Sequence, residues 1–359
     1  MNADTTVTPD GTVLTGSAMN KKLGFTAMIL SATGMGLVGT FSRLATPVDP
    51  DTGARYITGD FLAFGRMAVG AIGMLVIILA VKKLPKLKST KLSFTVVAGG
   101  FCIGTSLALY VSSTLMTSIA NAVFLIYTGP LFSAILAWIF LKEKISLTNA
   151  GFLVMVFIGM LMTIGIIDYT TEGGLDFALK IGADPAFPNK VIGDIFGLGS
   201  GLFYGLALFF YRYRGDIDSE VRGFWNFIFG AIGALVVMVL RFTMLDDTNP
   251  IRVMEGHHWL WAFALFLVSG FFAIGLLVVA GKNLLAVELS TTSYWECVVA
   301  LVLGILIWKE ALTPIGAIGG LLIILGGMGP VLTGLGGANK RRRANKRANQ
   351  ERAQAASSS

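Results

Sequence analysis

Long runs of apolar residues, separated by short polar breaks, occupy most of the chain. Each run is close to the roughly 20 residues that a helix needs to cross a hydrocarbon core about 30 Å thick. The runs do not alternate apolar and polar residues with the period of two that a membrane barrel strand requires. The pattern therefore predicts ten transmembrane helices, over residues 23–43, 60–81, 92–113, 118–140, 150–167, 193–213, 221–241, 259–280, 285–307 and 314–335.

The composition agrees with a bilayer environment. Hydrophobic residues make up 54% of the 359 residues and charged residues only 14%, whereas a soluble domain carries about a quarter charged residues. The predicted fold class is an all-α membrane protein. Cys102 and Cys297 both fall in apolar runs, so we expect small buried side chains and no disulfide framework. With only two histidines, the chain offers no normal zinc site, and neither a metal nor a cofactor is predicted.

The distribution of basic residues predicts the orientation. The net charge is +7, but a cluster of Lys and Arg in residues 340–352 accounts for much of it, so we do not expect a nucleic-acid partner. Most other Lys and Arg residues fall in connections that lie on one side of the membrane together with both termini. The positive-inside rule makes that side cytoplasmic and predicts a multi-pass protein of the plasma (inner) membrane. The basic tail is expected to meet anionic membrane lipids or to remain solvated.

The chain contains an internal repeat. YTGPLFSAILAWIFLKEKIS at 127–146 matches YWECVVALVLGILIWKEALT at 294–313 with a constant offset of 167. GAIG occurs at both 70–73 and 230–233, and the first and sixth spans also match at an offset of 169. These alignments pair several polar positions of the two halves, namely Tyr127 with Tyr294, Lys142 with Lys309, Glu143 with Glu310, Arg66 with Asn226, Ser31 with Ser200 and Arg43 with Arg212.

Each copy of the repeat holds five predicted spans, which is an odd number. The second copy must therefore enter the membrane from the opposite side, as in alternating-access carriers whose central site lies between inverted repeats. The predicted organisation is a disordered cytoplasmic tail at 1–22, a first five-helix half at 23–167, an exterior loop at 168–192, a second half at 193–335 and a basic cytoplasmic tail at 336–359.

This arrangement resembles the drug/metabolite transporter superfamily, and its EamA-like ten-helix exporters in particular. The segment from Pro130 to Glu143, followed by Gly159, and its second copy ending at Glu310, followed by Gly319 and Gly326, carry the likeness. The resemblance implies export of a small metabolite or drug across the plasma membrane through a cavity between the halves. The second repeat of that family often has Glu-Pro where this chain has Glu296 and Cys297, so the resemblance leaves open whether the helix breaks here.

Glu296 is the leading candidate for the mechanism. An ionisable side chain near the middle of a span costs about 3 kcal/mol or more, so it is a functional candidate by default. Glu296 follows Tyr294 and Trp295, which we include in the candidate site. Three roles are open: coupling transport to protons, balancing the charge of a cationic or amine-bearing substrate, or a structural pairing with Arg66.

Further polar and aromatic side chains in the spans complete the candidate substrate-binding or coupling site. Arg66 is expected either to bind an anionic group of the substrate or to pair with Glu296 or Asp60. Asn226 and Asn121 offer amides to a substrate or tie helices together. Aromatic side chains could line the cavity or pack in the membrane, and the candidates are Tyr110, Tyr127 and Tyr204.

The predicted function is secondary transport of an amino acid or related amphipathic metabolite, or of a drug, by alternating access. Export is favoured by the resemblance, with an importer or exchanger as the alternative. An intramembrane enzyme is disfavoured because both histidines lie in the 242–258 connection, away from Ser200 in the sequence GLGSG. A channel is disfavoured because no filter-like loop is visible. The expected partners are a small-molecule substrate and, if Glu296 couples transport, protons, and either a monomer or a homodimer is compatible with the sequence.

Overall fold

A computed structural model describes most of the chain. The described residues are 5–7, 13–15, 20–51, 55–56, 58–142, 147–163, 167–169, 175–176, 187–211, 217–244, 250–284, 289, 292–310 and 313–329. The predicted basic tail at 336–359 lies outside them, as do Glu143 and Arg212.

Within the described residues, seven helices are long and apolar enough to cross a membrane, and three shorter apolar helices accompany them. The protein is therefore an all-helical membrane protein, and these helices fall at the ten predicted positions. The long spans are α1 (Lys21–Gly36) with α2 (Val38–Ala45), α3 (Gly59–Ala80), α5 (Phe94–Met116), α6 (Ile119–Ile126) with α7 (Gly129–Leu141), α9 (Lys190–Phe210), α10 (Ser219–Met244), and α11 (Gly256–Ala264) with the π-helix η2 (Leu265–Phe272) and α12 (Ala273–Asn283). The shorter helices are α8 (Leu147–Thr163), α14 (Trp295–Trp308) and Pro314–Gly329.

A few short elements lie between or before the spans. Strands β1 (Thr5–Val7) and β2 (Val13–Thr15) pair within the segment predicted as a disordered tail, and β3 (Asp168–Tyr169) pairs with β4 (Leu175–Asp176) within the predicted exterior loop. Helix α4 (Leu84–Ser89) follows α3, and the 3-10 helix η1 (Pro250–Val253) precedes α11.

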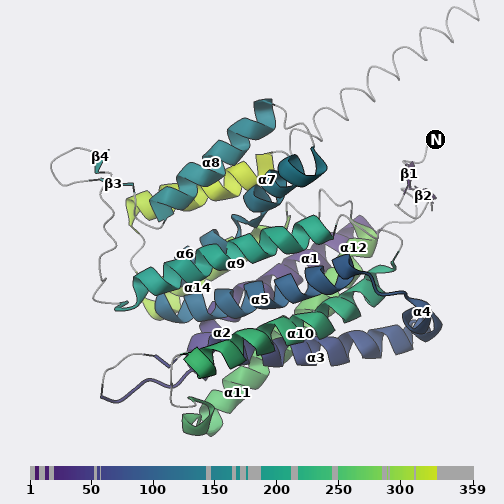
Figure 1. Ribbon diagram of the computed structural model, residues 1–359, viewed down its shortest axis with the longest axis horizontal. Coiled ribbons are helices and arrows are strands. Elements are labelled where there is room, and N and C mark those ends of the chain that lie inside the picture. The colour runs from purple at the N-terminus through teal and green to yellow at the C-terminus, as the bar shows by residue number, and fades with distance from the viewer. Residues whose placement is uncertain are drawn as a thin grey trace, which may run out of the picture.

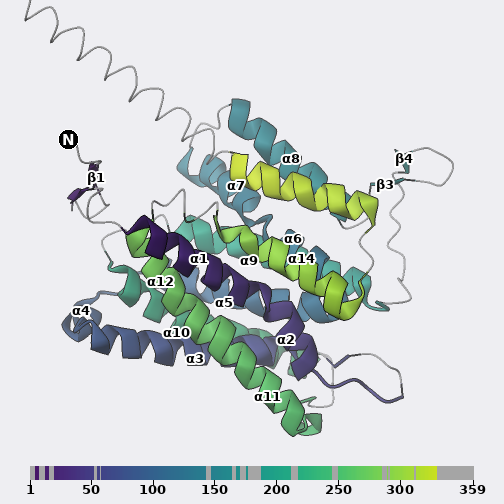
Figure 2. The same ribbon diagram turned by 180° about the vertical axis from the view of Figure 1, so that it is seen from behind.

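The two ends of the helical bundle can be told apart by the helices that begin and end there (Figures 1 and 2). At one end α1 begins, α3 ends and α4 lies, with basic residues that include Lys21, Lys83 and Lys86. We call this the basic end. At the other, which we call the far end, α2 ends and α3 begins. Helix α8 and the C-terminal helix lie side by side at the edge of the bundle in both views, where a Cβ added to Gly159 would lie 2.5 Å from the Gly319 carbonyl oxygen.

Equivalent helix crossings in the two halves use equivalent contacts. Helix α1 crosses α12, and the repeat alignment maps this pair onto α9 and α5. At the first crossing the Ser31 hydroxyl donates to the Ala273 carbonyl at 2.6 Å; at the second, the Ser106 hydroxyl donates to the Ser200 carbonyl at 2.8 Å. Both bonds lie in the buried interior and join one half to the other, as interhelical bonds commonly do in membranes.

The ends of α7 and α14 also match. Each helix ends on a lysine in the left-handed conformation, Lys142 with φ 52° and Lys309 with φ 55°. The N–H of each donates back to a carbonyl five residues earlier, on Ala137 and Gly304, and these residues are again 167 apart. The sequence match at Lys142 and Lys309 therefore reflects the same helix termination in both halves.

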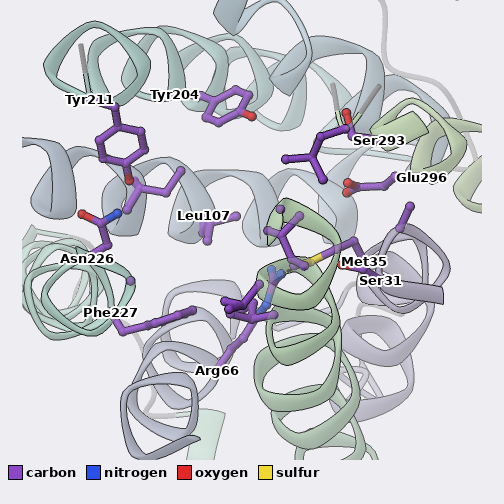
Figure 3. Close-up of a pocket in the computed structure, with 18 of the residues that line it drawn as sticks. Ser31, Met35, Arg66, Leu107, Tyr204, Tyr211, Asn226, Phe227, Ser293 and Glu296 are labelled. Atoms are coloured by element: carbon purple, nitrogen blue, oxygen red, sulfur yellow. Dashed lines mark hydrogen bonds between the residues drawn. The ribbon is translucent and has the colours of Figure 1, made fainter. Parts of the chain in front are cut away.

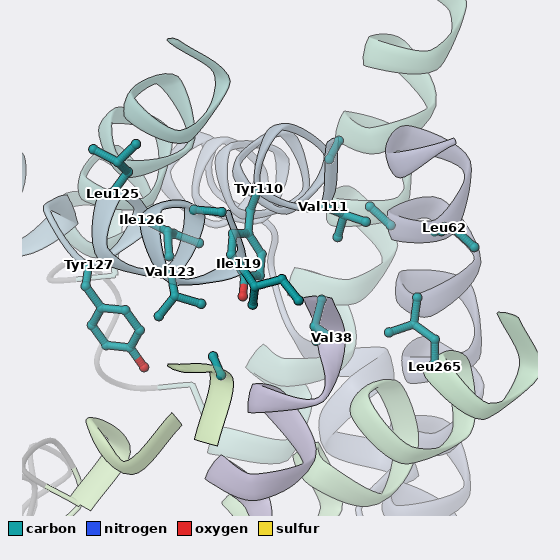
Figure 4. Packing of buried hydrophobic residues seen from close by; sticks show 14 of the residues in the cluster. Val38, Leu62, Tyr110, Val111, Ile119, Val123, Leu125, Ile126, Tyr127 and Leu265 are labelled. Atoms are coloured by element: carbon teal, nitrogen blue, oxygen red, sulfur yellow. The ribbon is translucent and has the colours of Figure 1, made fainter. Parts of the chain in front are cut away.

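The core lies where the helices of the two halves meet (Figure 4). Side chains from α2, α3, α5, α6 and η2 contribute Val38, Leu62, Tyr110, Val111, Ile119, Val123 and Leu265, all at most 2% exposed. Helices α5 and α10 approach so closely that a side chain at Gly104 would collide with the Gly230 carbonyl. Close glycine packing of this kind holds helices together in lipid, where apolar burial alone gives no preference for a neighbouring helix.

Candidate functional site

A cavity of about 690 Å³ lies between the two halves. Its lining comes from α1, α3, α5, α6, α9, α10, α12 and α14 together with Tyr127, and Figure 3 shows polar side chains that point into it. The cavity extends toward the basic end, where Ser219, Arg222 and Gly281 line it. It thus lies at the repeat boundary, as an inverted-repeat architecture predicts.

Glu296 projects into this cavity from the first turn of α14. A turn at Tyr294 separates α14 from the helical residues 292–293, so the helix is interrupted here without a proline. The resemblance alone left this break open, and the structure contains it. The Tyr127 hydroxyl donates to Glu296 Oε2 at 2.8 Å. The position at a helix N-terminus also favours a negative charge on Glu296, because the exposed N–H groups carry partial positive charge.

Arg66 faces the same cavity from α3 but does not have the partners expected for it. Asp60 instead binds Arg241, with Oδ2 2.8 Å from Nε and Oδ1 3.2 Å from Nη2. No ion pair within 4.0 Å joins Arg66 to Glu296 in the described part of the chain. The alternative of pairing with Asp60 is wrong, because the acid lies at the far end of α3 beside a closer arginine.

The Arg66 guanidinium is held by two other groups. Its Nε donates to the Ser269 carbonyl at 3.2 Å, and its Nη2 lies 2.6 Å from the Met35 sulfur. Its Nη1 is buried and has no hydrogen-bond partner among the described residues. A buried guanidinium N–H without a partner is costly, so this atom is ready to bind an oxygen of a ligand.

The remaining predicted residues separate into two groups. Tyr110, Tyr127, Tyr204 and Asn226 line the cavity. The Tyr110 hydroxyl and the Asn226 Oδ1 are buried without a hydrogen-bond partner in the described structure.

Three predicted residues lie outside the lining. Asn121 donates to the Thr163 carbonyl at 3.2 Å and so joins α6 to α8. The Trp295 ring N–H donates to the Thr33 hydroxyl at 3.1 Å on the outer side of α1, and the ring is 43% exposed. Tyr294 stacks at a tilt against Tyr127, with ring centroids 5.1 Å apart, and supports the cavity wall from behind. A span position alone could not reveal which face of the helix each residue occupies.

A buried ion pair closes the far end. Arg43 on α2 lies 2.6 Å from Glu310, which follows α14, and both side chains are buried. The guanidinium also donates to the carbonyls of Thr114 and Thr117, each at 2.8 Å, and Glu310 accepts from the Ile119 N–H at 3.1 Å. The repeat alignment had singled out Arg43 and Glu310, but not as partners of each other.

At the basic end a looser group of charges joins α3 and α4 to α10. Lys83 lies 2.9 Å from Glu220 and 3.1 Å from Asp218, and Lys86 lies 2.9 Å from Asp218. The hydrogen bond from Lys86 is the main cause that lowers the pKa of Asp218 below its usual value, with a further contribution from Lys83. These groups neighbour the part of the cavity that Ser219 and Arg222 line.

Both halves of the chain match the model of the EamA-like transporter family, over residues 22–165 and 191–329. The chain belongs to the EamA-like transporter family. A solved structure titled "Crystal structure of protein" is 17% identical to this chain, covers 88% of this chain and 96% of its own, and has a TM-score of 0.51. At this identity the likeness concerns the fold alone. A comparison with curated proteins found no match. Family membership confirms a membrane transporter of small molecules and excludes the enzyme alternative.

Proposed function

We propose that this EamA-like transporter carries a zwitterionic, amphipathic molecule of the amino-acid class by alternating access between two inverted five-helix halves. One observation carries the proposal: among the described residues, the cavity at the repeat boundary is lined by one acid, Glu296, and by Arg66, and these two form no ion pair within 4.0 Å, while a second arginine, Arg222, lines the cavity at the basic end. A ligand with an amine and a carboxylate would satisfy both Glu296 and Arg66. A cavity with one uncompensated charge would favour a simple anion or cation instead.

The rest of the lining supports an apolar side chain on the ligand. Methionine, leucine and phenylalanine side chains make up much of the wall, including Met28, Met35, Leu107 and Phe227. Methionine adapts its shape to irregular ligands because its side chain is unbranched and polarizable. L-Phenylalanine is therefore a suitable probe: it has both charged groups and a large apolar side chain.

The cavity opens on the side from which an exporter would load its substrate, and the preference for export itself comes from the family resemblance. The cavity extends to the basic end, which the positive-inside rule makes cytoplasmic together with both termini. The Arg43–Glu310 pair closes the far end. In this reading the described conformation faces the cytoplasm of a cell with the protein in its plasma membrane, and it loads substrate from inside. Glu296 also remains the candidate for coupling to protons, because it is an acid at the centre of the path.

The experiment uses purified protein in liposomes and three probes of nearly equal size. L-Phenylalanine has both charges, 2-phenylethylamine lacks the carboxylate, and 3-phenylpropanoate lacks the amine. We expect saturable counterflow of phenylalanine and slower exchange of the other two. Glu296→Gln should lower phenylalanine exchange and remove the preference over phenylpropanoate.

Glu255→Gln is the matched control, since it makes the same chemical change at an exposed residue preceding α11, outside the cavity lining. It should leave exchange unchanged. Absence of counterflow with all three probes would contradict a carrier of this class. Unitary currents would indicate a channel, and uptake driven only into the cytoplasmic side would indicate an importer.

A further inference from the structure

The eighth span contains a helical irregularity that its repeat counterpart lacks. Residues Leu265–Phe272 form the π-helix η2, which ends where the Ala273 N–H donates to the carbonyl of Val268, five residues earlier. The equivalent span of the first half, α5, is α-helical over Phe94–Met116. A π-helical turn inside an α-helix is less well bonded than the regular form and often marks a functional site.

η2 lies directly against Arg66. The Ser269 carbonyl accepts the bond from Arg66 Nε described above. At the next residue, Gly270, an added Cβ would lie 3.0 Å from the Arg66 carbonyl oxygen and 3.3 Å from the Arg66 Cγ. The backbone of η2 therefore lies close to both the main chain and the side chain of Arg66, and a side chain at Gly270 would press on both.

η2 is also attached to α1. The Ser269 hydroxyl donates to the Gly34 carbonyl, and a Cβ added to Gly34 would lie 3.4 Å from the Val268 carbonyl oxygen. Met35, the next residue of α1, supplies the sulfur at Arg66 Nη2. The hydrogen bond from Ser269 to Gly34 thus keeps the two groups that contact the guanidinium close together: the Ser269 carbonyl and the Met35 sulfur.

We infer that η2 positions Arg66 as the carboxylate-binding group of the cavity, with Ser269 as the positioning residue. Two of the three guanidinium nitrogens are held by protein groups, and only Nη1 is left for the ligand. A guanidinium held in this way loses little further freedom when it binds a carboxylate, which is the advantage of preorganisation. The inference rests on the proposed function, because it assumes a ligand with a carboxylate.

The arrangement also connects ligand binding to the two halves. Arg66 belongs to the first half and η2 to the second, so the guanidinium is attached across the boundary between them. A carboxylate at Nη1 meets a fixed guanidinium only while Ser269 and Met35 keep their contacts with Arg66, so its affinity depends on how the two halves are placed. Such a difference in affinity between states is what a ligand needs in order to shift a conformational equilibrium.

The test compares two serine substitutions. Ser269→Ala removes the bond to Gly34, and Ser106→Ala removes the corresponding kind of bond between α5 and α9. Both hydroxyls are fully buried and donate to a carbonyl of another helix, but Ser106 neither lines the cavity nor contacts Arg66. The readout is the ratio of dissociation constants for 2-phenylethylamine and L-phenylalanine, measured on the purified full-length protein.

We expect Ser269→Ala to lower the preference for phenylalanine by about threefold to tenfold, a part of what a charge-assisted hydrogen bond contributes. Ser106→Ala should leave the ratio unchanged. In an Arg66→Gln background Ser269→Ala should have no effect on the ratio, because a residue that acts through another shows coupling in a double-mutant cycle. Gly270→Ala, which pushes on the Arg66 backbone, should act in the same direction as Ser269→Ala.

Equal effects of the two serine substitutions, or an effect that persists in Arg66→Gln, would overturn the inference. So would a wild-type protein that binds both probes equally, since Arg66 would then bind no carboxylate. Failure of the proposed function is a separate result: absence of counterflow in liposomes, with the binding preference and its dependence on Ser269 retained, would reject the carrier and keep the positioning role.

Discussion

The two five-helix halves share their packing contacts and differ beside the cavity. Ser31 and Ser106 make the same kind of bond at equivalent crossings, and Lys142 and Lys309 end equivalent helices in the same conformation. At the centre the halves diverge. The position that holds Glu296 in the second half holds Gly129 in the first, Arg66 corresponds to Asn226, and the π-helix η2 corresponds to a regular part of α5.

The difference has a physical reason. In an alternating-access carrier the two halves exchange their arrangements between the inward-facing and outward-facing states. Packing contacts that are equivalent in the two halves suit this exchange, because each half then adopts the arrangement that the other had. A zwitterion has two unlike ends, and a strictly symmetric site would oppose two acids or two bases. One acid and one base can be supplied only where the repeat is broken, and the polar side chains that we assign to the ligand are at those positions.

The largest expected effect concerns the ion pairs at the two ends of α3 and α10. Asp60 and Arg241 are both buried at the far end, whereas Lys86 and Asp218 at the basic end are 63% and 24% exposed. Breaking a buried pair costs about 3–5 kcal/mol. Asp60→Asn should therefore lower the thermal unfolding temperature in detergent much more than Lys86→Gln. Equal shifts would contradict the difference between the ends.

An intermediate effect is expected when the two corresponding polar positions of the cavity are changed. Arg66→Gln removes a charge-assisted bond to the ligand, which contributes about 1.5–3 kcal/mol, so phenylalanine affinity should fall by about ten- to hundredfold. Binding of 2-phenylethylamine should change little. Asn226→Ala removes only a neutral group, and its effect on phenylalanine should be smaller. Titration of both variants with both probes checks this, and a larger loss in Asn226→Ala would place the carboxylate in the other half.

The smallest effect concerns the pH dependence at the basic end. The pKa of Asp218 is lowered in the folded protein, chiefly by the hydrogen bond from Lys86, so its ionised form stabilises the fold. That contribution is complete above the unfolded pKa of about 3.9 and is lost as pH falls through the folded value. Because the pair is partly exposed, it is worth about 0.2–1 kcal/mol. The difference in unfolding temperature between wild type and Asp218→Asn should be constant from about pH 5 to 8 and should shrink as the pH falls below the unfolded pKa and through the lowered folded pKa. A difference that grows on acidification would contradict this assignment.

The helices, the repeat and the presence of an acid, Glu296, within a span could be predicted because each depends on local sequence. Transfer of an apolar run into lipid is favourable whatever surrounds it, and a buried acid is unusual wherever it occurs. The helix break at Tyr294 could not be predicted, since no proline marks it and it appears only in the backbone. The sequence also could not show which face of its helix Asn121 or Trp295 occupies, because a span that is apolar on all sides has no periodic pattern that indicates its orientation.

The sequence by itself determined that this chain is a membrane protein of two related five-span halves with an acid and a base in its spans. Only the tertiary structure decided what those charges contact. The Arg66 guanidinium is held by a carbonyl 203 residues away and by a methionine sulfur, and Arg43 closes the far end with Glu310. A backbone carbonyl is present at every residue and an apolar sulfur has no charge, so neither leaves a pattern along the chain. Their role arises only where folding brings them to the cavity.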